Sequence, residues 1–436
     1  MTKNTFIIGG GYTGISAALH LTKAGHKVTI IESDSCLGGL AGTFEATPKI
    51  RLEKFYHHWF SSDTAVLDLI TELGLGEKIL RRNSNTGLYF ANSIFRLASP
   101  IDLLKFHPIP FLDRIRTGLM ALYARKINEW MPLEKITAVD WIKKVAGEKS
   151  YKVIWGPLLK GKFGVEAENV SAVWFWNKLK LRGSSRGKNG KEELIYFDGG
   201  FGSLTDSIAE ALKARGVTIK YSETVNSIET VTENNIKIKT NSTEYQADNV
   251  LVTIPLPIAL NLIKNLPSAL TTTANQIRFL GNVCLVLRLK KSLSSTYWLN
   301  VADPTFPFVG VIEHTNLDDK SKYDGQHIAY VSKYLPITDE LFSLTDDQYF
   351  EYAYPFLKKI FPDFSKDWII GHHVWRASYS QPVVTLNYSK LIPPAKMPIG
   401  NIWMSNMAQI YPEDRGTNYA VRAGKDIAEE MVRYLK

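Results

Sequence analysis

The stretch "NTFIIGGGYTGISAALHLTKAGHKVTIIES", residues 4–33, decides the fold of this chain. Apolar residues 6–8 predict a strand that runs into three spaced glycines, and apolar positions at helical spacing follow. Residues 28–31 predict a second strand, which ends at an acid, Glu32. A strand, a Gly-x-Gly-x-x-Gly turn, a helix, a second strand and a terminal acid are together typical of a dinucleotide-binding fold.

The three glycines have different physical roles in such a turn. Gly9 forms the tight turn after the strand, Gly11 lets a pyrophosphate approach the backbone, and Gly14 lets the helix pack closely on the strand. The first helical turn, at Tyr12 and Thr13, then directs its N–H groups at the anion. We therefore expect these five residues to bind the cofactor.

A second acid-and-glycine pattern follows the first unit. Glu32 is placed to accept hydrogen bonds from ribose hydroxyls, and its charge disfavours a 2′-phosphate there. Six residues later comes the pair Gly38-Gly39, followed by Leu40. From here the chain resembles the flavin-containing amine oxidase, protoporphyrinogen oxidase and phytoene desaturase superfamily, in which an acid, a short spacer and a glycine pair wrap FAD. Leu40 departs from the usual Arg or Lys, but two branches of that superfamily often carry apolar residues at this position.

The resemblance continues over most of the chain. Residues 196–219 resemble the segment in which this superfamily returns to the FAD domain, with a helix over 204–214, and Val225 falls where the backbone contacts the adenine side. The closing segment "GNIWMSNMAQIYPEDRGTNYAVRAGKDIAEEM", residues 400–431, resembles the part in which a strand reaches the cofactor. The helix after that strand would point its N-terminus at the flavin.

Within the closing segment, Asn406 stands where many members carry an Asp that holds FAD, and protoporphyrinogen oxidases similarly carry Asn. The resemblance implies that Gly416, Thr417 and Asn418 begin the helix under the flavin ring. An ordinary strand followed by a capped helix is the alternative. Neither of the two cysteines, at positions 36 and 284, falls in this segment, so we expect FAD to be bound non-covalently.

These features predict an α/β fold class with a discontinuous, Rossmann-like FAD-binding domain of the GR2 type and an inserted, mixed α+β substrate domain. We expect the FAD-binding domain to comprise residues 1–85, 195–280 and 391–436, because each range carries a piece of the nucleotide fold. The insertion 86–194 has the apolar spacing of helices, whereas 281–390 has alternating or continuous apolar runs typical of strands. A sheet covered by helices would form a pocket over the flavin.

Two adjacent histidines lie among aromatic residues in "KFYHHWFSSD", residues 54–63. In an extended segment His57 and His58 face opposite sides, so they are poorly placed to bind one metal ion, and we expect no metal site. The segment also resembles the "HxFH" loop of UDP-galactopyranose mutases, in which a histidine lies against the flavin. By that match His58 is the catalytic candidate, and a hydrogen-bonded core histidine is the alternative.

Weaker candidates lie outside these motifs. Arg182 and Arg186 belong to a basic, Gly- and Ser-rich loop that could meet a substrate phosphate, although such loops are more often simply solvated. Trp59 is a candidate for substrate contact. Tyr411 is a candidate for catalysis and for the pocket wall, as in the aromatic cage of amine oxidases, with packing as the alternative. The flavin-proximal lysine of amine oxidases has no motif match in this chain.

Composition constrains partners and location. The net charge of +9 indicates affinity for anions such as phosphates, nucleotide sugars or acidic lipid headgroups, with a solvated basic surface as the alternative. We expect no nucleic-acid partner, and the oligomeric state stays open. The low cysteine count and the absence of a signal-peptide pattern favour a cytoplasmic location.

The stretch "LLKFHPIPFLDRIRTGLMALYARKI", residues 103–127, is amphipathic and basic. It would suit peripheral docking on the cytoplasmic face of an anionic membrane, where an apolar substrate could be collected. We prefer the alternative interpretation, in which a helix pair covers the pocket with its apolar face inward.

The resemblance implies a FAD-dependent oxidoreductase, protoporphyrinogen-oxidase-like, that transfers a hydride from a substrate C–H bond to flavin N5. The substrate would be a small molecule, either apolar or phosphorylated. One alternative is a redox-neutral flavin enzyme acting on a nucleotide sugar or glycosyl-lipid, similar to UDP-galactopyranose mutase. The other is a non-enzymatic binding protein similar to the Rab escort and GDP-dissociation-inhibitor proteins, which lack a well-kept FAD site.

Overall fold

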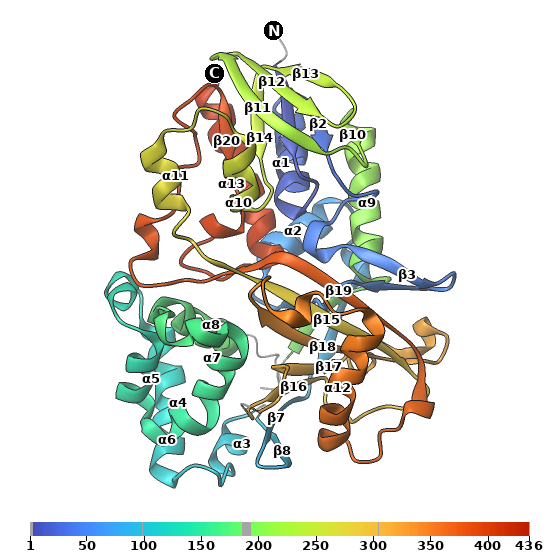
Figure 1. Ribbon diagram of the computed structural model, residues 1–436, viewed down its shortest axis with the longest axis vertical. Coiled ribbons are helices and arrows are strands. Elements are labelled where there is room, and N and C mark those ends of the chain that lie inside the picture. Colours follow the sequence, from blue (N-terminus) through green and yellow to red (C-terminus); the bar gives the residue numbers. More distant parts are fainter. Residues whose placement is uncertain (1–2, 98, 185–192, 304, 436) are drawn as a thin grey trace.

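The computed structural model describes residues 3–97, 99–184, 193–303 and 305–435 (Figure 1). The upper part in that view is built on a five-stranded parallel sheet in the order β10-β2-β1-β14-β20. Its strands come from distant parts of the chain: β1 (Asn4–Ile8), β2 (Lys27–Ile31), β10 (Thr218–Lys220), β14 (Asn249–Val252) and β20 (Ile402–Met404). The central strands are almost wholly buried, as expected of a parallel sheet covered on both faces.

Two helices that lie far apart in sequence pack together against this sheet. Helix α1 (Tyr12–Lys23) follows β1 and contacts the closing helix α13 (Thr417–Tyr434). A Cβ atom at Gly424 would lie 2.3 Å from the Thr13 carbonyl oxygen, so this approach requires glycine. The hydroxyl of Ser16 donates to the Val421 carbonyl at 2.7 Å and fixes the pair.

Smaller elements complete the upper part. Besides the nucleotide fold there are the three-stranded antiparallel sheet β11-β12-β13, the hairpin β3-β4, the three-stranded antiparallel sheet β5-β9-β6 and four helices. Their bounds are β11 (Val225–Thr232), β12 (Asn235–Thr240), β13 (Glu244–Ala247), β3 (Thr43–Thr47), β4 (Ile50–Glu53), β5 (Trp59–Phe60), β9 (Glu193–Phe197), β6 (Ile79–Asn83), α2 (Thr64–Glu72), α9 (Gly200–Ala214), α10 (Leu256–Leu262) and α11 (Ser268–Ala274).

The lower part contains a seven-stranded sheet in the order β19-β15-β18-β17-β16-β7-β8, with helix α12 (Asp346–Ile360) packed on it. Its strands are β19 (Ile369–Pro382), β15 (Phe279–Leu289), β18 (His327–Leu335), β17 (Gly310–Glu313), β16 (Trp298–Val301), β7 (Thr86–Phe90) and β8 (Ser93–Arg96). The prediction of a helical first insertion is therefore wrong over residues 86–96. These residues join the second insertion because β7, whose first four residues are buried, pairs with the edge of β16.

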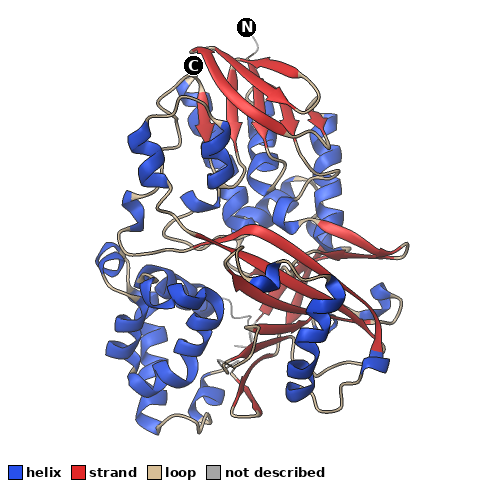
Figure 2. Cartoon of the chain, in the orientation of Figure 1, coloured by secondary structure: helices blue, strands red, loops and turns tan. Residues whose placement is uncertain are grey.

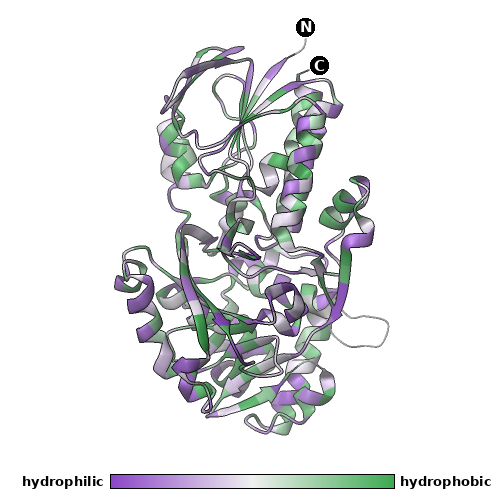
Figure 3. Cartoon of the chain, turned by 90° about the vertical axis from the view of Figure 1, so that its right-hand side faces the viewer, coloured by the Kyte–Doolittle hydropathy of each residue, from purple (hydrophilic) through white to green (hydrophobic). Residues whose placement is uncertain are grey.

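The helices of the first insertion lie within residues 100–184 and form a separate group beside the sheet (Figure 2). This group comprises α3 (Pro100–Leu104), α4 (Phe111–Lys126), α5 (Ala138–Ala146), α6 (Glu148–Ser150), α7 (Gly156–Phe163) and α8 (Ala172–Ser184). Apolar and hydrophilic residues are interspersed along the helices of both parts (Figure 3). No helix within the described ranges has both the length and the apolar character needed to cross a bilayer.

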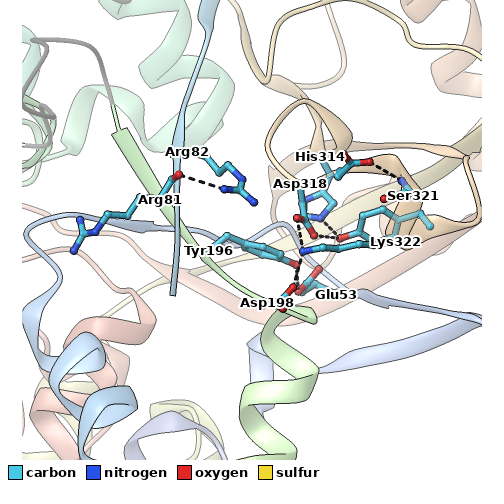
Figure 4. A network of polar contacts seen from close by, with 11 residues as sticks. Glu53, Arg81, Arg82, Tyr196, Asp198, His314, Asp318, Ser321 and Lys322 are labelled. Carbon is cyan, nitrogen blue, oxygen red and sulfur yellow. Dashed lines mark hydrogen bonds and ion pairs between the residues drawn. The ribbon is translucent and has the colours of Figure 1, made fainter. Parts of the chain in front are cut away.

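A polar network, buried at Glu53 and Tyr196 and exposed at Asp198 and Lys322, links the two parts (Figure 4). Tyr196 donates to Glu53 at 2.6 Å in the upper part. In the segment between β17 and β18, Lys322 binds Asp318 at 2.8 Å and reaches Asp198, the residue after β9, at 2.7 Å. The Lys322–Asp198 pair therefore connects the two parts through an exposed ion pair.

Candidate functional site

A cavity of about 500 Å³ lies at the carboxyl ends of the parallel strands, where open α/β sheets bind their ligands. Segments from all three ranges of the predicted FAD-binding domain line it. Among the lining residues are Gly9, Gly11, Tyr12, Thr13, Glu32, Gly38, Gly39, Leu40, Val225, Asn406, Gly416 and Thr417. Twelve of the fourteen residues predicted to bind cofactor therefore lie around one cavity.

The first glycines shape its anion-binding end. Gly9 has a φ of +105°, which favours glycine, and Gly11 is the residue from which helix α1 begins. A Cβ atom at Gly11 would meet nothing within 4 Å, so the backbone there is open to a ligand. A Cβ at Gly14 would lie 2.1 Å from the Gly9 carbonyl oxygen. Gly14 therefore packs closely against the Gly9 backbone behind the cavity and does not line the cavity itself.

Glu32 is buried beside this loop and organises it. Its Oε2 accepts the Gly10 N–H at 2.6 Å, and its Oε1 accepts the Asp34 N–H at 2.8 Å. The carboxylate therefore fixes two loops at the wall of the cavity that it lines. Gly38 donates to the Gly10 carbonyl at 2.9 Å, so the second glycine pair closes the same end.

The closing segment supplies the opposite end. The Oδ1 atom of Asn406 accepts the Ala408 N–H at 3.0 Å, whereas its buried Nδ2 has no partner among the described residues. An unpartnered amide donor in a residue that lines the cavity fits a ligand with acceptor oxygens. Helix α13 begins after Gly416, at the cavity wall. Asn418 instead points away, because its Oδ1 accepts the Val66 N–H at 3.1 Å.

A second, smaller cavity of about 290 Å³ adjoins the first. Arg415 lines both cavities, so the two meet at its side chain. Most of the smaller cavity is apolar or aromatic. Its wall comes mainly from the helical group and the seven-stranded sheet, and includes Tyr56, His58, Phe60, Trp155, Leu158, Trp174, Phe175, Trp298 and Tyr334.

The two histidines face different cavities. His57 lines the larger cavity and its Nδ1 lies 2.7 Å from the Phe55 carbonyl oxygen, whereas His58 lines the smaller one. The Nδ1 of His58 lies 3.0 Å from the Tyr297 hydroxyl. Burial lowers the pKa of His57 below its usual value. The alternation predicted for an extended segment is observed here, and it places His57 rather than His58 against the cofactor cavity.

A charged cluster lies where the cavities meet. Lys178 and Lys162 approach the Oδ2 atom of Asp414 at 2.6 and 3.7 Å, and the Arg415 guanidinium donates to the Tyr334 hydroxyl. Burial opposes ionisation of Asp414, but these cations hold the pKa of its carboxyl well below its usual range. Sequence reasoning missed this cluster, because its members lie far apart in the chain and belong to no motif.

Several predicted side chains lie elsewhere. Trp59, at 1% exposure, is a core residue and not a substrate contact: its Nε1 donates to Thr417 at 2.7 Å and its ring packs on Phe201. Tyr411 lines neither cavity and donates to Glu134 at 3.0 Å, which corresponds to the packing alternative. Arg186 lies outside the described residues. The same holds for the side chain of Arg182, whose backbone is in α8.

The fold and the larger cavity together define a dinucleotide-binding protein of the flavoprotein type. The chain belongs to the family described as flavin-containing amine oxidoreductases, whose family model matches residues 12–432. The residues around the larger cavity fit FAD, which is the cofactor of this family. Among the described residues no cluster suited to a metal ion is present, and no cysteine lines either cavity.

Individual relatives are distant. A Synechococcus elongatus protein assigned as a zeta-carotene desaturase is 24% identical over 51% of this chain and 50% of its own length. Coproporphyrinogen III oxidase of Staphylococcus aureus is 24% identical over 60% of this chain and 62% of its own length. The matches thus span about half to three fifths of these curated relatives.

Among solved structures, reduced UDP-galactopyranose mutase has a TM-score of 0.77 at 15% identity, covering 100% of this chain and 96% of its own. A likeness at this level of identity shows a shared fold.

Proposed function

We propose that this flavin-dependent oxidoreductase acts as an oxidase or desaturase on a small molecule held in the smaller cavity. Bound FAD would supply a hydride acceptor, so loss of hydride from a substrate C–H bond, together with loss of a proton from the neighbouring carbon or nitrogen to solvent, would leave a C=C or C=N bond. The observation that carries the proposal is the meeting of two cavities at Arg415. One of them is glycine-lined and suited to a dinucleotide, and the other is largely aromatic.

The chain's own contribution would be positioning and exclusion of water. Tyr56 and Phe60 line the smaller cavity from the segment that carries the histidines, and Trp174 lines it from helix α8. The hydroxyl of Tyr297 orients the His58 imidazole through their 3.0 Å contact. No strong general base is required when the flavin accepts hydride, and these residues supply a closed, largely apolar surface for the reacting carbon.

The experiment is anaerobic titration of the purified flavoprotein with candidate substrates that carry an oxidisable C–H bond, including porphyrinogens, carotenoid precursors and amines. The proposal predicts that one class bleaches the flavin absorbance and is converted to a product with one more double bond. Conversion of a substrate with no change in the spectrum of the oxidised flavin would contradict the proposal.

A redox-neutral function on a nucleotide sugar or glycosyl-lipid is the second candidate. It is favoured by the cationic side chains Lys162, Lys178 and Arg415 in the smaller cavity, which suit a phosphorylated substrate. The discriminating measurement is turnover before and after chemical reduction of the flavin. A redox-neutral enzyme would turn over only after reduction and would return the flavin in the reduced state.

A further inference from the structure

Charge is unevenly distributed around the smaller cavity. At one end three cationic side chains, Lys162, Lys178 and Arg415, surround one carboxylate, Asp414. The other lining residues are neutral side chains or His58. The cavity therefore carries an excess of positive charge at the end next to the cofactor cavity.

Asp414 has closer partners than Lys162. The Lys178 ammonium lies 2.6 Å from its Oδ2, and the Gln381 amide donates to its Oδ1 at 3.0 Å. Lys162 lies at 3.7 Å, beyond ordinary hydrogen-bond distance. Asp414 is only 4% exposed, so it does not present a free carboxylate to a ligand.

The Lys162 ammonium is instead directed among aromatic rings. Its Nζ lies 4.9 Å from the ring centre of Trp174 and 5.2 Å from that of Tyr334. Burial lowers the pKa of Lys162 well below its usual value, although Asp414 opposes this effect. An anionic group bound beside Lys162 would offset this cost of keeping the ammonium charged.

We infer that the smaller cavity binds substrates through an anionic group, a carboxylate, sulfonate or phosphate, which contacts Lys162 while the apolar body lies along the aromatic wall. This inference rests on the proposed function in taking the smaller cavity as the substrate site. Lys162 is thus a specificity-determining residue that selects against cationic amines.

Three probes with the same apolar chain test this inference: hexanesulfonate, hexanol and hexylammonium. Binding is followed by quenching of tryptophan fluorescence, since three tryptophans line the cavity. Hexanesulfonate should bind at least tenfold more tightly than hexanol, and hexylammonium should bind more weakly than both. Lys162→Gln should remove the advantage of hexanesulfonate and leave hexanol unchanged. Lys160→Gln, an exposed position on the same helix, is the matched control and should change nothing.

Tighter binding of hexylammonium, or an unchanged hexanesulfonate affinity in Lys162→Gln, would overturn the inference. Flavin content is read separately from the visible spectrum of the same samples. If the protein contains flavin and prefers the cationic probe, the anion site is refuted and the proposed function is not. A colourless protein refutes the proposed function, while fluorescence still reports the probes.

A different observation, on the surface of the helical group, carries a second proposal. Helix α4 has its large apolar residues on the outside: Phe111, Leu112, Leu119, Leu122 and Tyr123 are 52–67% exposed. The face that packs on the protein carries Thr117, Met120 and Ala124. The expectation that this helix covers the pocket with its apolar face inward is therefore wrong.

The outward residues form a continuous stripe. Positions 111, 115, 119 and 122 follow the i, i+4, i+8, i+11 spacing of one helix face, and Ile101 and Leu104 of the preceding helix are also exposed. Arg125 and Lys126 are exposed at the end of α4 and line a surface hollow with Leu119, Leu122 and Tyr123. Such a stripe complements a bilayer of anionic lipid: its apolar side chains can contact the acyl chains, and its basic side chains can contact the negatively charged headgroups.

We propose that the α3–α4 face docks on anionic membranes. Sedimentation with phosphatidylcholine vesicles, with and without phosphatidylserine, should show binding that needs the anionic lipid. Leu112→Asp/Leu119→Asp should lower the bound fraction at least tenfold, and Arg125→Glu/Lys126→Glu should remove the preference for phosphatidylserine. Val231→Asp, at a 59% exposed apolar position of β11, is the control and should bind as the wild type does.

No binding by the wild type, or equal binding by Leu112→Asp/Leu119→Asp, would overturn this proposal. A wild-type dimer that the same pair of substitutions converts to a monomer would also overturn it, because the stripe would then be an interface between copies of the chain. The apolar pair is on the outer surface, so folding is checked by flavin content and circular dichroism.

Discussion

His57 and His58 are neighbours in sequence, yet His57 lines the larger cavity and His58 lines the smaller one. The chain therefore passes along the boundary between the two sites at this point. The two imidazoles are held by different partners, the Phe55 carbonyl for His57 and the Tyr297 hydroxyl for His58.

This separation predicts that the two histidines can be distinguished by mutation. His57→Ala should weaken FAD binding by about tenfold, or about 1.4 kcal/mol, and shift the flavin spectrum. His58→Ala should keep full flavin content and lower kcat/KM for the substrate. Flavin titration of the apoprotein and steady-state kinetics check both. The reverse pattern would place the flavin against His58.

Gly11 and Gly14 should fail in different ways when replaced by valine. A side chain at Gly11 enters open space in the cavity, so Gly11→Val should fold normally and lose FAD binding. At Gly14 the Cβ would collide with the Gly9 carbonyl at 2.1 Å, so Gly14→Val should lower the free energy of unfolding itself. Urea denaturation of both apoproteins separates the two cases. A Gly11→Val protein with full flavin content would show that no cofactor approaches this backbone.

Glu32 should contribute to stability as well as to cofactor binding. Glu32→Ala leaves the buried N–H of Gly10 without its partner, at a cost of about 1–3 kcal/mol in the free energy of unfolding. Glu32→Gln keeps a carbonyl acceptor for one of the two loops and should lose less. The comparison is made by thermal denaturation without added FAD. Equal stability of all three proteins would mean that the carboxylate has no structural role.

Asp63 predicts a pH dependence of stability. Burial raises its pKa from 3.8 to about 6 in the folded protein. Between these values the folded chain holds a proton that the unfolded chain has lost, so the contribution of Asp63 to the free energy of unfolding falls as pH rises from 3.8 to about 6, by at most about 3 kcal/mol.

Asp63→Asn is the matched test, because the amide oxygen can still accept the Phe60 N–H that Asp63 accepts at 2.9 Å. Urea denaturation across this interval should show that the free energy of unfolding of the wild type falls relative to that of the variant as pH rises. Parallel slopes in the two proteins would mean that Asp63 titrates normally in the folded state.

The parts of the fold that follow from local sequence could be predicted. The first strand, its glycine turn and helix α1 are consecutive, so the residue spacing fixes their geometry. The closing segment could be placed at the cofactor only through the resemblance. The expectation of helix over residues 86–96 fails because β7 and β8 form a local hairpin that turns at Ala91 and Asn92, and β7 also pairs with β16, more than two hundred residues later in the chain.

Site residues whose role depends on the backbone could be predicted from the sequence. Residues that contribute through their side chains were harder to predict. Gly9, Gly11 and Gly38 lie at the cofactor cavity because their conformation or lack of a Cβ is itself the requirement. Trp59 and Tyr411 have the same aromatic character as the residues that line the cavities. Only tertiary packing places Trp59 in the core and Tyr411 against it. The cluster around Asp414 is assembled from α7, α8 and the loop before α13, so no single segment of sequence displays it.

The measurement that tests the central claim most directly is identification of the cofactor released when the purified protein is denatured. The account predicts FAD, in an amount equimolar with the chain and fully separable from it without covalent attachment. A colourless protein that takes up no FAD even when the cofactor is supplied in excess would contradict it.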